Sequence, residues 1–206
     1  MSNAWKASPF LLKYFDTFKD LPEKELLALA EWSELRQYKE GDVLISQGEA
    51  PVSAIYILNG ALKLSRTICN IHGADESHVE VVVQIFGAGD CIGDVALYED
   101  FRFKGSICAI TDCEVLVVDR TELMKFADNN PRILKNLYIR TSKKFLRVVE
   151  CVDLSYGSLL DRIGVLAAEC SKVGIDLYKH FTKADIARML GVSRVSVSKQ
   201  LNSHND

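Results

Sequence analysis

The sequence predicts an α+β protein with three parts: an N-terminal β roll of the double-stranded jelly-roll kind, a long helix, and a C-terminal helix-turn-helix. Three observations carry this prediction. Short apolar runs separated by glycines follow Tyr38, a heptad pattern follows Pro131, and two short helical patterns flank Gly191. Closely spaced apolar runs with glycine breaks are typical of compact all-β domains, whereas a heptad pattern is typical of paired helices.

The composition is that of a globular protein. The 206 residues are 48% apolar and 26% charged, which is enough to bury a core and favours two domains. A net charge of -3 argues against indiscriminate coating of nucleic acid, so any basic surface must be local. The first residues lack the apolar core of a signal peptide, and no apolar run approaches the roughly 18 residues of a membrane helix. We therefore expect a cytoplasmic protein without a membrane partner.

The cysteines show no metal or redox spacing. None of the six forms a Cys-x-x-Cys pair, so we interpret them as small buried hydrophobes, with redox sensing as the alternative. They are Cys69, Cys91, Cys108, Cys113, Cys151 and Cys170. No metal site is expected.

The N-terminal part begins with packing helices between Pro9 and Leu35, one of which starts at Pro22. Strands are then predicted at 53–58, 61–68, 79–86 and 115–118. The first two flank Asn59 and Gly60, a pair that favours a two-residue hairpin turn.

Asn130 and Pro131 open a long helix whose apolar residues recur at heptad spacing. We call these residues the seam: Leu134, Tyr138, Thr141, Phe145, Val148 and Val152. Steps of four and three favour pairing with a second copy, while one helix lying on the roll is the alternative. Residues 154–158, which include Gly157, are the candidate hinge. Residues 159–173 follow as the first helix of the C-terminal domain.

The segment 181–201 predicts two short helices around a tight turn. Thr182 and Asp185 form a capping-box pattern, Gly191 ends the first helix, and Ser193 caps the second. Val197 can then pack inward, which leaves an outer face that suits a DNA major groove. That face carries Arg194, Val195, Ser198 and Lys199. An ordinary pair of amphipathic helices is the alternative interpretation.

This segment resembles the helix-turn-helix of the CRP/FNR family of bacterial transcription regulators. The family pattern Thr-x-x-(Glu/Asp)-Ile-Ala-x-x-x-Gly-x-Ser-Arg-x-x-Val-x-(Arg/Lys)-x-Leu is filled from Thr182 to Leu201. The resemblance implies that Arg194 reads a base, Lys199 makes a second groove or backbone contact, and Thr182 and Ser193 contact phosphates. Where the family often has Glu, this chain has Val195, which favours a thymine methyl group.

Residues 89–111, here called the cassette, form the one plausible small-molecule site. Gly93 allows a sharp turn, after which the amides of Asp94, Val95 and Ala96 can open toward an anion. An additional glycine-rich turn of the roll is the alternative. The segment resembles the family's phosphate-binding cassette, and the resemblance implies an effector there.

The cassette departs from the cyclic-nucleotide binders of the family. Phe103 stands where they place an arginine, with Arg102 and Lys104 on either side, and Arg147 and Val148 replace the two hydroxyl residues that meet adenine. Either Arg102 or Lys104 could still reach a phosphate, but lysine cannot reproduce the two-pronged contact of arginine. Cyclic AMP is therefore not expected, the effector stays open, and no cofactor is assigned.

The resemblance implies a sensing domain at residues 1–128, a dimerisation helix and hinge at 129–155, and a DNA-binding domain at 156–206. We expect a homodimer on a palindromic site in double-stranded DNA, with RNA polymerase as a further candidate partner. The alternative is a sensor or interaction module without productive DNA binding, because the sequence stops at Asp206, before the family's winged hairpin. An enzyme is least expected, since no nucleophile, base and orienting group cluster in the sequence.

Overall fold

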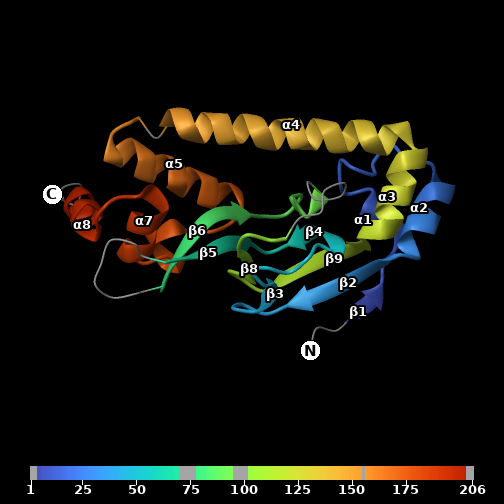
Figure 1. Ribbon diagram of the computed structural model, residues 1–206, viewed down its shortest axis with the longest axis horizontal. Helices are drawn as coiled ribbons and strands as arrows, with labels where there is room; N and C mark the ends of the chain where they lie inside the picture. The colour runs from blue at the N-terminus through green and yellow to red at the C-terminus, as the bar shows by residue number, and fades with distance from the viewer. Residues whose placement is uncertain (1–3, 70–77, 95–101, 155, 203–206) are drawn as a thin grey trace.

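The computed structural model describes residues 4–69, 78–94, 102–154 and 156–202, and these form a β roll, a long helix and a helical head (Figure 1). Three short helices lie at one end of the roll. The long helix α4 (Pro131–Leu154) runs along one side of it to the other end, where the head, helices α5 to α8 at residues 159–202, lies beside strands β5 (Leu62–Cys69) and β6 (His78–Phe86). No helix in these ranges is long and apolar enough to cross a membrane.

The roll consists of two antiparallel sheets. One has the strand order β1-β2-β9-β4-β7 and the other has the order β3-β8-β5-β6. The strands are β1 (Ala4–Lys6), β2 (Ser33–Tyr38), β3 (Val43–Ile45), β4 (Ser53–Asn59), β5 (Leu62–Cys69), β6 (His78–Phe86), β7 (Cys91–Ile92), β8 (Ser106–Ala109) and β9 (Cys113–Asp119). All four strands predicted from the sequence are confirmed within one or two residues.

The predicted hairpin around Gly60 is wrong. Strand β4 pairs with β7 and β9, while β5 pairs with β6 and β8 in the other sheet. Gly60 lies at a corner between the sheets, where a Cβ atom would come within 2.3 Å of the Asp112 carbonyl oxygen. The glycine is needed for this close approach, as well as for its φ of 85°.

Helices α1 (Pro9–Leu12), α2 (Glu23–Ala30) and α3 (Arg120–Asn129) close one end of the roll. Pro22 directly precedes α2 as predicted, and Glu23 and Glu25 lie in its first turn, where they favour the positive end of the helix dipole. Buried Phe15 and Phe18 both contact Tyr56 of β4. This aromatic group joins the N-terminal segment to the first sheet.

Helix α4 (Pro131–Leu154) begins at Pro131 as predicted and presents two different faces. Ile133 and Leu137 are buried against the roll, and Arg140 and Lys144 continue the same face at steps of three and four. The seam lies on the next face, where Tyr138 is 74% exposed and Phe145 67% exposed. The side chains of Val148 and Val152 lie outside the described part. The seam residues that are described therefore face away from the roll, which disfavours the single-helix alternative.

The head contains α5 (Leu159–Lys172), α6 (Leu177–His180), α7 (Lys183–Leu190) and α8 (Arg194–Asn202). Its core is continuous with the roll: Ala61 and Ile110 of the roll share one cluster with Ile163 and Cys170 of α5. Val82 and Ile85 of β6 pack against the same cluster. The head is therefore docked on the second sheet and does not extend freely from the end of α4.

Candidate nucleic-acid interface and effector cassette

The helix-turn-helix is formed by capping residues that the sequence specifies locally. The hydroxyl of Thr182 accepts from the Asp185 amide at 3.2 Å, and the Asp185 carboxylate accepts from the Thr182 amide at 2.8 Å. This capping box satisfies two amides that the first turn would otherwise leave unpaired. Gly191 ends α7 with a φ of 64°, and the Ser193 hydroxyl accepts from the Ser196 amide at 3.1 Å. Each of these four capping predictions is confirmed.

The network around α7 also fixes the protonation of Asp185. Burial alone would raise the pKa of Asp185, but its hydrogen bonds with Thr182 and the charge of Arg188 lower it below the ordinary value. The Arg188 guanidinium lies 3.4 Å from the carboxylate. Asp185 therefore stays ionised when the cap is formed.

Helix α8 is buried on the side that packs on α7, and most of its other residues are exposed or half-buried. Val197 is fully buried and Leu201 half-buried, so both turn toward Ile186 in α7 as expected. Ser193, Arg194, Val195 and Lys199 are exposed, and Ser198 is half-buried. Thr182, before the start of α7, is also exposed. An arginine and a lysine on an exposed helix that follows a capped turn can contact bases and phosphates of a duplex.

The described part of the cassette contains a glycine-dependent turn. Gly93 has a φ of 90°, and a Cβ atom there would lie 2.8 Å from the Ser53 carbonyl oxygen. Any other residue would be strained at this position. The next residue, Asp94, has a side chain that is only 1% exposed. Val95 and Ala96, the other predicted amide donors, lie outside the described residues.

Two cations of α4 pair with Asp94. The Lys144 Nζ lies 2.5 Å from Asp94 Oδ1, and the Arg140 Nε lies 3.6 Å from Oδ2. Lys144 also donates to the Cys91 carbonyl at 2.8 Å, and Arg140 donates to the Gly89 carbonyl at 3.3 Å. Burial alone would lower the pKa of Arg140, but the neighbouring Cys91 and Asp94 raise it, so the guanidinium stays charged. The carboxylate predicted to meet an effector is thus paired with the long helix.

The residues on either side of Phe103 have different surroundings. Phe103 is buried in the core of the roll, whereas Arg102 and Lys104 are exposed. The Arg102 guanidinium donates to the Gly48 carbonyl at 3.0 Å. An aromatic side chain therefore fills the position where a phosphate-binding arginine was sought, and the arginine beside it contacts a neighbouring turn.

Sequence reasoning missed Arg140 and Lys144, although a signal was present. Ile133, Leu137, Arg140 and Lys144 repeat at steps of four, three and four, which is a second heptad stripe next to the seam. The spacing places Arg140 and Lys144 on the face that packs on the roll, where a buried cation needs an anionic partner. Asp94 is that partner.

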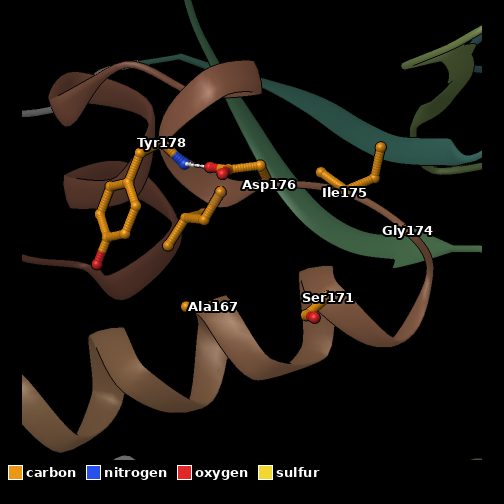
Figure 2. A pocket seen from close by; sticks show the side chains of 7 residues that line it. Ala167, Ser171, Gly174, Ile175, Asp176 and Tyr178 are labelled. Carbon is orange, nitrogen blue, oxygen red and sulfur yellow. Dashed lines mark hydrogen bonds between the residues drawn. The ribbon is translucent and has the colours of Figure 1, made fainter.

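The head also has a hollow of about 420 Å³ between α5 and α6 (Figure 2). It is lined by Ala167, Ser171, Gly174, Ile175, Asp176, Leu177 and Tyr178. The Asp176 carboxylate accepts from the amides of Tyr178 and Lys179 at 2.8 and 3.1 Å. The charged group of this hollow, the Asp176 carboxylate, thus caps α6 and is not free to hold a ligand.

Four of the cysteines are described as free of disulfide bonds. Cys91, Cys113 and Cys170 are buried and Cys108 is half-buried. Burial raises the pKa of the Cys91 thiol, and the charge of Asp94 raises it further, while burial raises that of Cys170 to about 11. Such thiols are poor nucleophiles, as expected of small buried hydrophobes. Within the described ranges, no three His, Cys, Asp or Glu side chains gather as metal ligands would.

Residues 35–130 match the family model of the cyclic nucleotide-binding domain. The matched range runs from within β2 to the end of α3 and includes the cassette. The cyclic AMP receptor protein of Thermus thermophilus is 22% identical over 183 residues, which cover 88% of this chain and 81% of the relative.

Solved structures of regulators share the fold. A protein of Eubacterium rectale described as a transcriptional regulator of the CRP/FNR family aligns with a TM-score of 0.73 at 14% identity, over 94% of this chain and 88% of that one. The c-di-GMP responsive global regulator CLP of Xanthomonas campestris aligns with a TM-score of 0.63 at 19% identity, over 85% and 87% of the two chains. The similarity thus extends through the roll, the long helix and the head.

Proposed function

Because the chain belongs to the CRP/FNR family of transcription regulators, we propose that it binds a palindromic site in double-stranded DNA as a homodimer, with α8 as recognition helix. One observation carries the proposal. Helix α8 exposes Arg194, Val195 and Lys199, and it belongs to a two-helix unit in which the first turn of each helix is capped by a side chain. Arginine can contact guanine with two hydrogen bonds, and lysine can contact a phosphate.

The seam of α4 supports the homodimer. Tyr138 and Phe145 are large and exposed, and they lie three and four residues from Thr141, which is the spacing of a coiled coil. A second copy of α4 related by a two-fold axis would cover these side chains. Two recognition helices would then face successive major grooves, and half-sites about one DNA turn apart would follow.

The effector of the roll is proposed to differ from cyclic AMP. Asp94 pairs with Lys144, and buried Phe103 occupies the position of the phosphate-binding arginine. The relatives themselves are named for different ligands, cyclic AMP for the Thermus protein and c-di-GMP for CLP. Membership of the family therefore leaves the ligand of this chain open.

Selection of duplexes from a random library by the purified dimer tests the proposed function. We expect enrichment of a palindrome, with one dimer bound per duplex and an affinity that falls as salt rises, because phosphate contacts release counterions. Enrichment of no sequence at low salt, or binding of one monomer per duplex, would contradict the proposal.

A further inference from the structure

A short turn between β6 and β7 contacts both the head and the long helix, and its last two residues are the first two of the cassette. Residues 87–90 form this turn, here called the relay turn. The Gly87 amide donates to the Asp90 carboxylate at 2.9 Å, and the Asp90 amide donates back to the Gly87 carbonyl at 3.0 Å. Gly89 and Asp90 each exchange one backbone hydrogen bond with Ile57 of β4, at 2.9 and 3.0 Å. Four hydrogen bonds therefore hold the relay turn in one conformation.

Gly87 is the point where the relay turn contacts the head. A Cβ atom on Gly87 would lie 2.5 Å from the Cβ of Val173 and 2.6 Å from its Cγ1. The φ of Gly87 is outside the left-handed region, so the backbone itself would accept alanine. Glycine is required here because the end of α5 packs directly on the turn.

The other end of the relay turn contacts α4 and leads into the cassette. Arg140 donates to the Gly89 carbonyl, and Lys144 donates to Cys91, the residue that follows the turn. Asp94, three residues further on, accepts from the same lysine. A displacement of Asp94 would therefore act on α4 through Lys144 and on the relay turn through the three residues that separate them.

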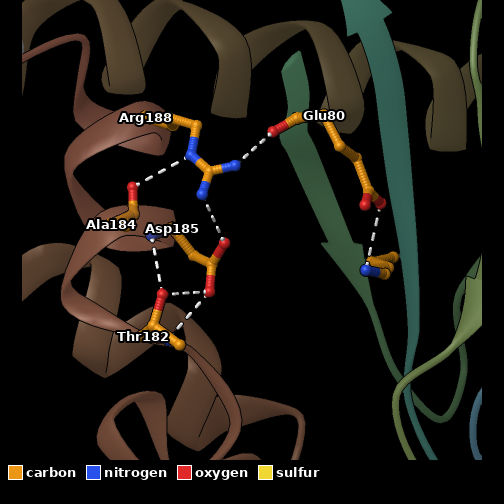
Figure 3. A network of polar contacts seen from close by, with 6 residues as sticks. Glu80, Thr182, Ala184, Asp185 and Arg188 are labelled. Atoms are coloured by element: carbon orange, nitrogen blue, oxygen red, sulfur yellow. Dashed lines mark hydrogen bonds and ion pairs between the residues drawn. The ribbon is translucent and has the colours of Figure 1, made fainter. Parts of the chain in front are cut away.

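A second contact holds the head on the same sheet. The Arg188 guanidinium of α7 donates to the Glu80 carbonyl of β6 at 3.2 Å, as Figure 3 shows. The Glu80 side chain points to the other side and pairs with Lys63 at 3.1 Å. The two head contacts lie at opposite ends of β6, which fixes the orientation of the head on the strand.

From these contacts we infer that the relay turn couples the cassette directly to the orientation of the DNA-binding head. This coupling does not pass through the candidate hinge at residues 154–158. The docked head leaves Arg194 and Lys199 exposed, so docking orients the recognition helix and does not hide it. A head that is already oriented loses less freedom when it binds DNA. Loss of docking should therefore weaken DNA binding, a consequence that rests on the proposed function.

The Gly87–Val173 contact permits a swap of side-chain volume as a test. Gly87→Ala places a methyl group against Val173 and should release the head. Val173→Gly removes both nearby atoms and leaves its Cα 3.1 Å from the new methyl group. The double variant should then dock again. Val173→Gly alone is the matched control for the flexibility that a second glycine adds beside Gly174.

Amide hydrogen exchange and DNA affinity should be measured on dimers of the unmutated chain, of Gly87→Ala, of Val173→Gly and of the double variant. We expect Gly87→Ala to speed exchange of the amides in residues 170–180 by about tenfold or more, and to weaken binding of the selected palindrome by about fivefold or more. In the double variant, the exchange rate of these amides and the affinity for the palindrome should both lie within about twofold of their values in Val173→Gly. Arg188→Gln, which leaves the roll core intact, should speed exchange in the head to a smaller extent.

Unchanged exchange in Gly87→Ala and in Arg188→Gln would overturn the docking contact. Faster exchange in Gly87→Ala with unchanged DNA affinity, or no recovery in the double variant, would overturn the coupling. If the unmutated dimer selects no duplex, the proposed function fails, and the exchange comparison still decides whether the head is docked through Gly87.

Discussion

The Lys144 ammonium group lies 2.5 Å from the Asp94 carboxylate, whose side chain is only 1% exposed. This ion pair joins the middle of α4 to the cassette across about 50 residues of sequence. The long helix is therefore attached to the sensing part through charge as well as through the apolar contacts of Ile133 and Leu137.

Removal of the Lys144 charge should destabilise the fold. Lys144→Met removes the shorter of the two described ion pairs of buried Asp94, and the pair with Arg140 at 3.6 Å remains. We expect a loss of about 1–3 kcal/mol of unfolding free energy, less than the about 3–5 kcal/mol of a fully buried pair, because Lys144 is partly exposed and Arg140 remains. Urea unfolding measures the loss. Lys143→Met, an exposed neighbour, is the matched control, and equal stability of the two variants would contradict the ion pair's role.

Cyclic AMP should bind weakly or not at all. An entering ribose would compete with Lys144 for Asp94, and Phe103 offers no charge to the cyclic phosphate. The free energy needed to break the Lys144–Asp94 pair would lower the affinity for cyclic AMP. Titration calorimetry should therefore detect no binding at micromolar concentrations, on the order used to classify such effectors. Tight binding that is lost in Asp94→Ala would show that the pair opens readily.

The seam should control assembly. Tyr138→Lys combined with Phe145→Lys places charges at two exposed seam positions, where pairing would have to desolvate them. We expect the unmutated chain to be dimeric and the double variant monomeric by light scattering. Lys143→Glu, which lies on the far side of the heptad from the seam, should stay dimeric. A monomeric unmutated chain at tens of micromolar, the order used for such measurements, would exclude the two-fold arrangement.

The cap of α7 should contribute a pH-dependent stability. The pKa of Asp185 is lowered in the folded state from its ordinary value of 3.8. The contribution is therefore fully present above that value and disappears as the pH falls through the lower folded pKa. Thr182→Ala should cost about 1 kcal/mol at neutral pH. Urea unfolding between acidic and neutral pH should show this difference shrinking on the acid side, and a constant difference would contradict the assignment.

The helix-turn-helix could be predicted closely because its signals are local. Thr182, Asp185, Gly191 and Ser193 each act on backbone groups within a few residues, so sequence spacing alone specifies the geometry. The start of α4 at Pro131 follows from the same kind of local rule.

The corner at Gly60 and the partner of Asp94 could not be predicted in this way. Asn59 and Gly60 favour a tight turn, but which strands pair beyond the turn depends on residues up to about 50 positions away. The sequence singles out Asp94 as a candidate effector contact, which stays a prediction. Its partners lie on α4, and only the packing of the helix on the roll brings Lys144 to it.

The recognition helix is tested most directly by comparing Arg194→Ala with Lys199→Ala on the selected palindrome and on single-base variants of it, across a salt series. The account predicts that Arg194→Ala loses about 1–3 kcal/mol of discrimination at one base pair of each half-site. Lys199→Ala should instead weaken binding to all duplexes alike and reduce the salt dependence. Equal affinity and equal discrimination in Arg194→Ala and the unmutated dimer would contradict the assignment of α8 as the recognition helix.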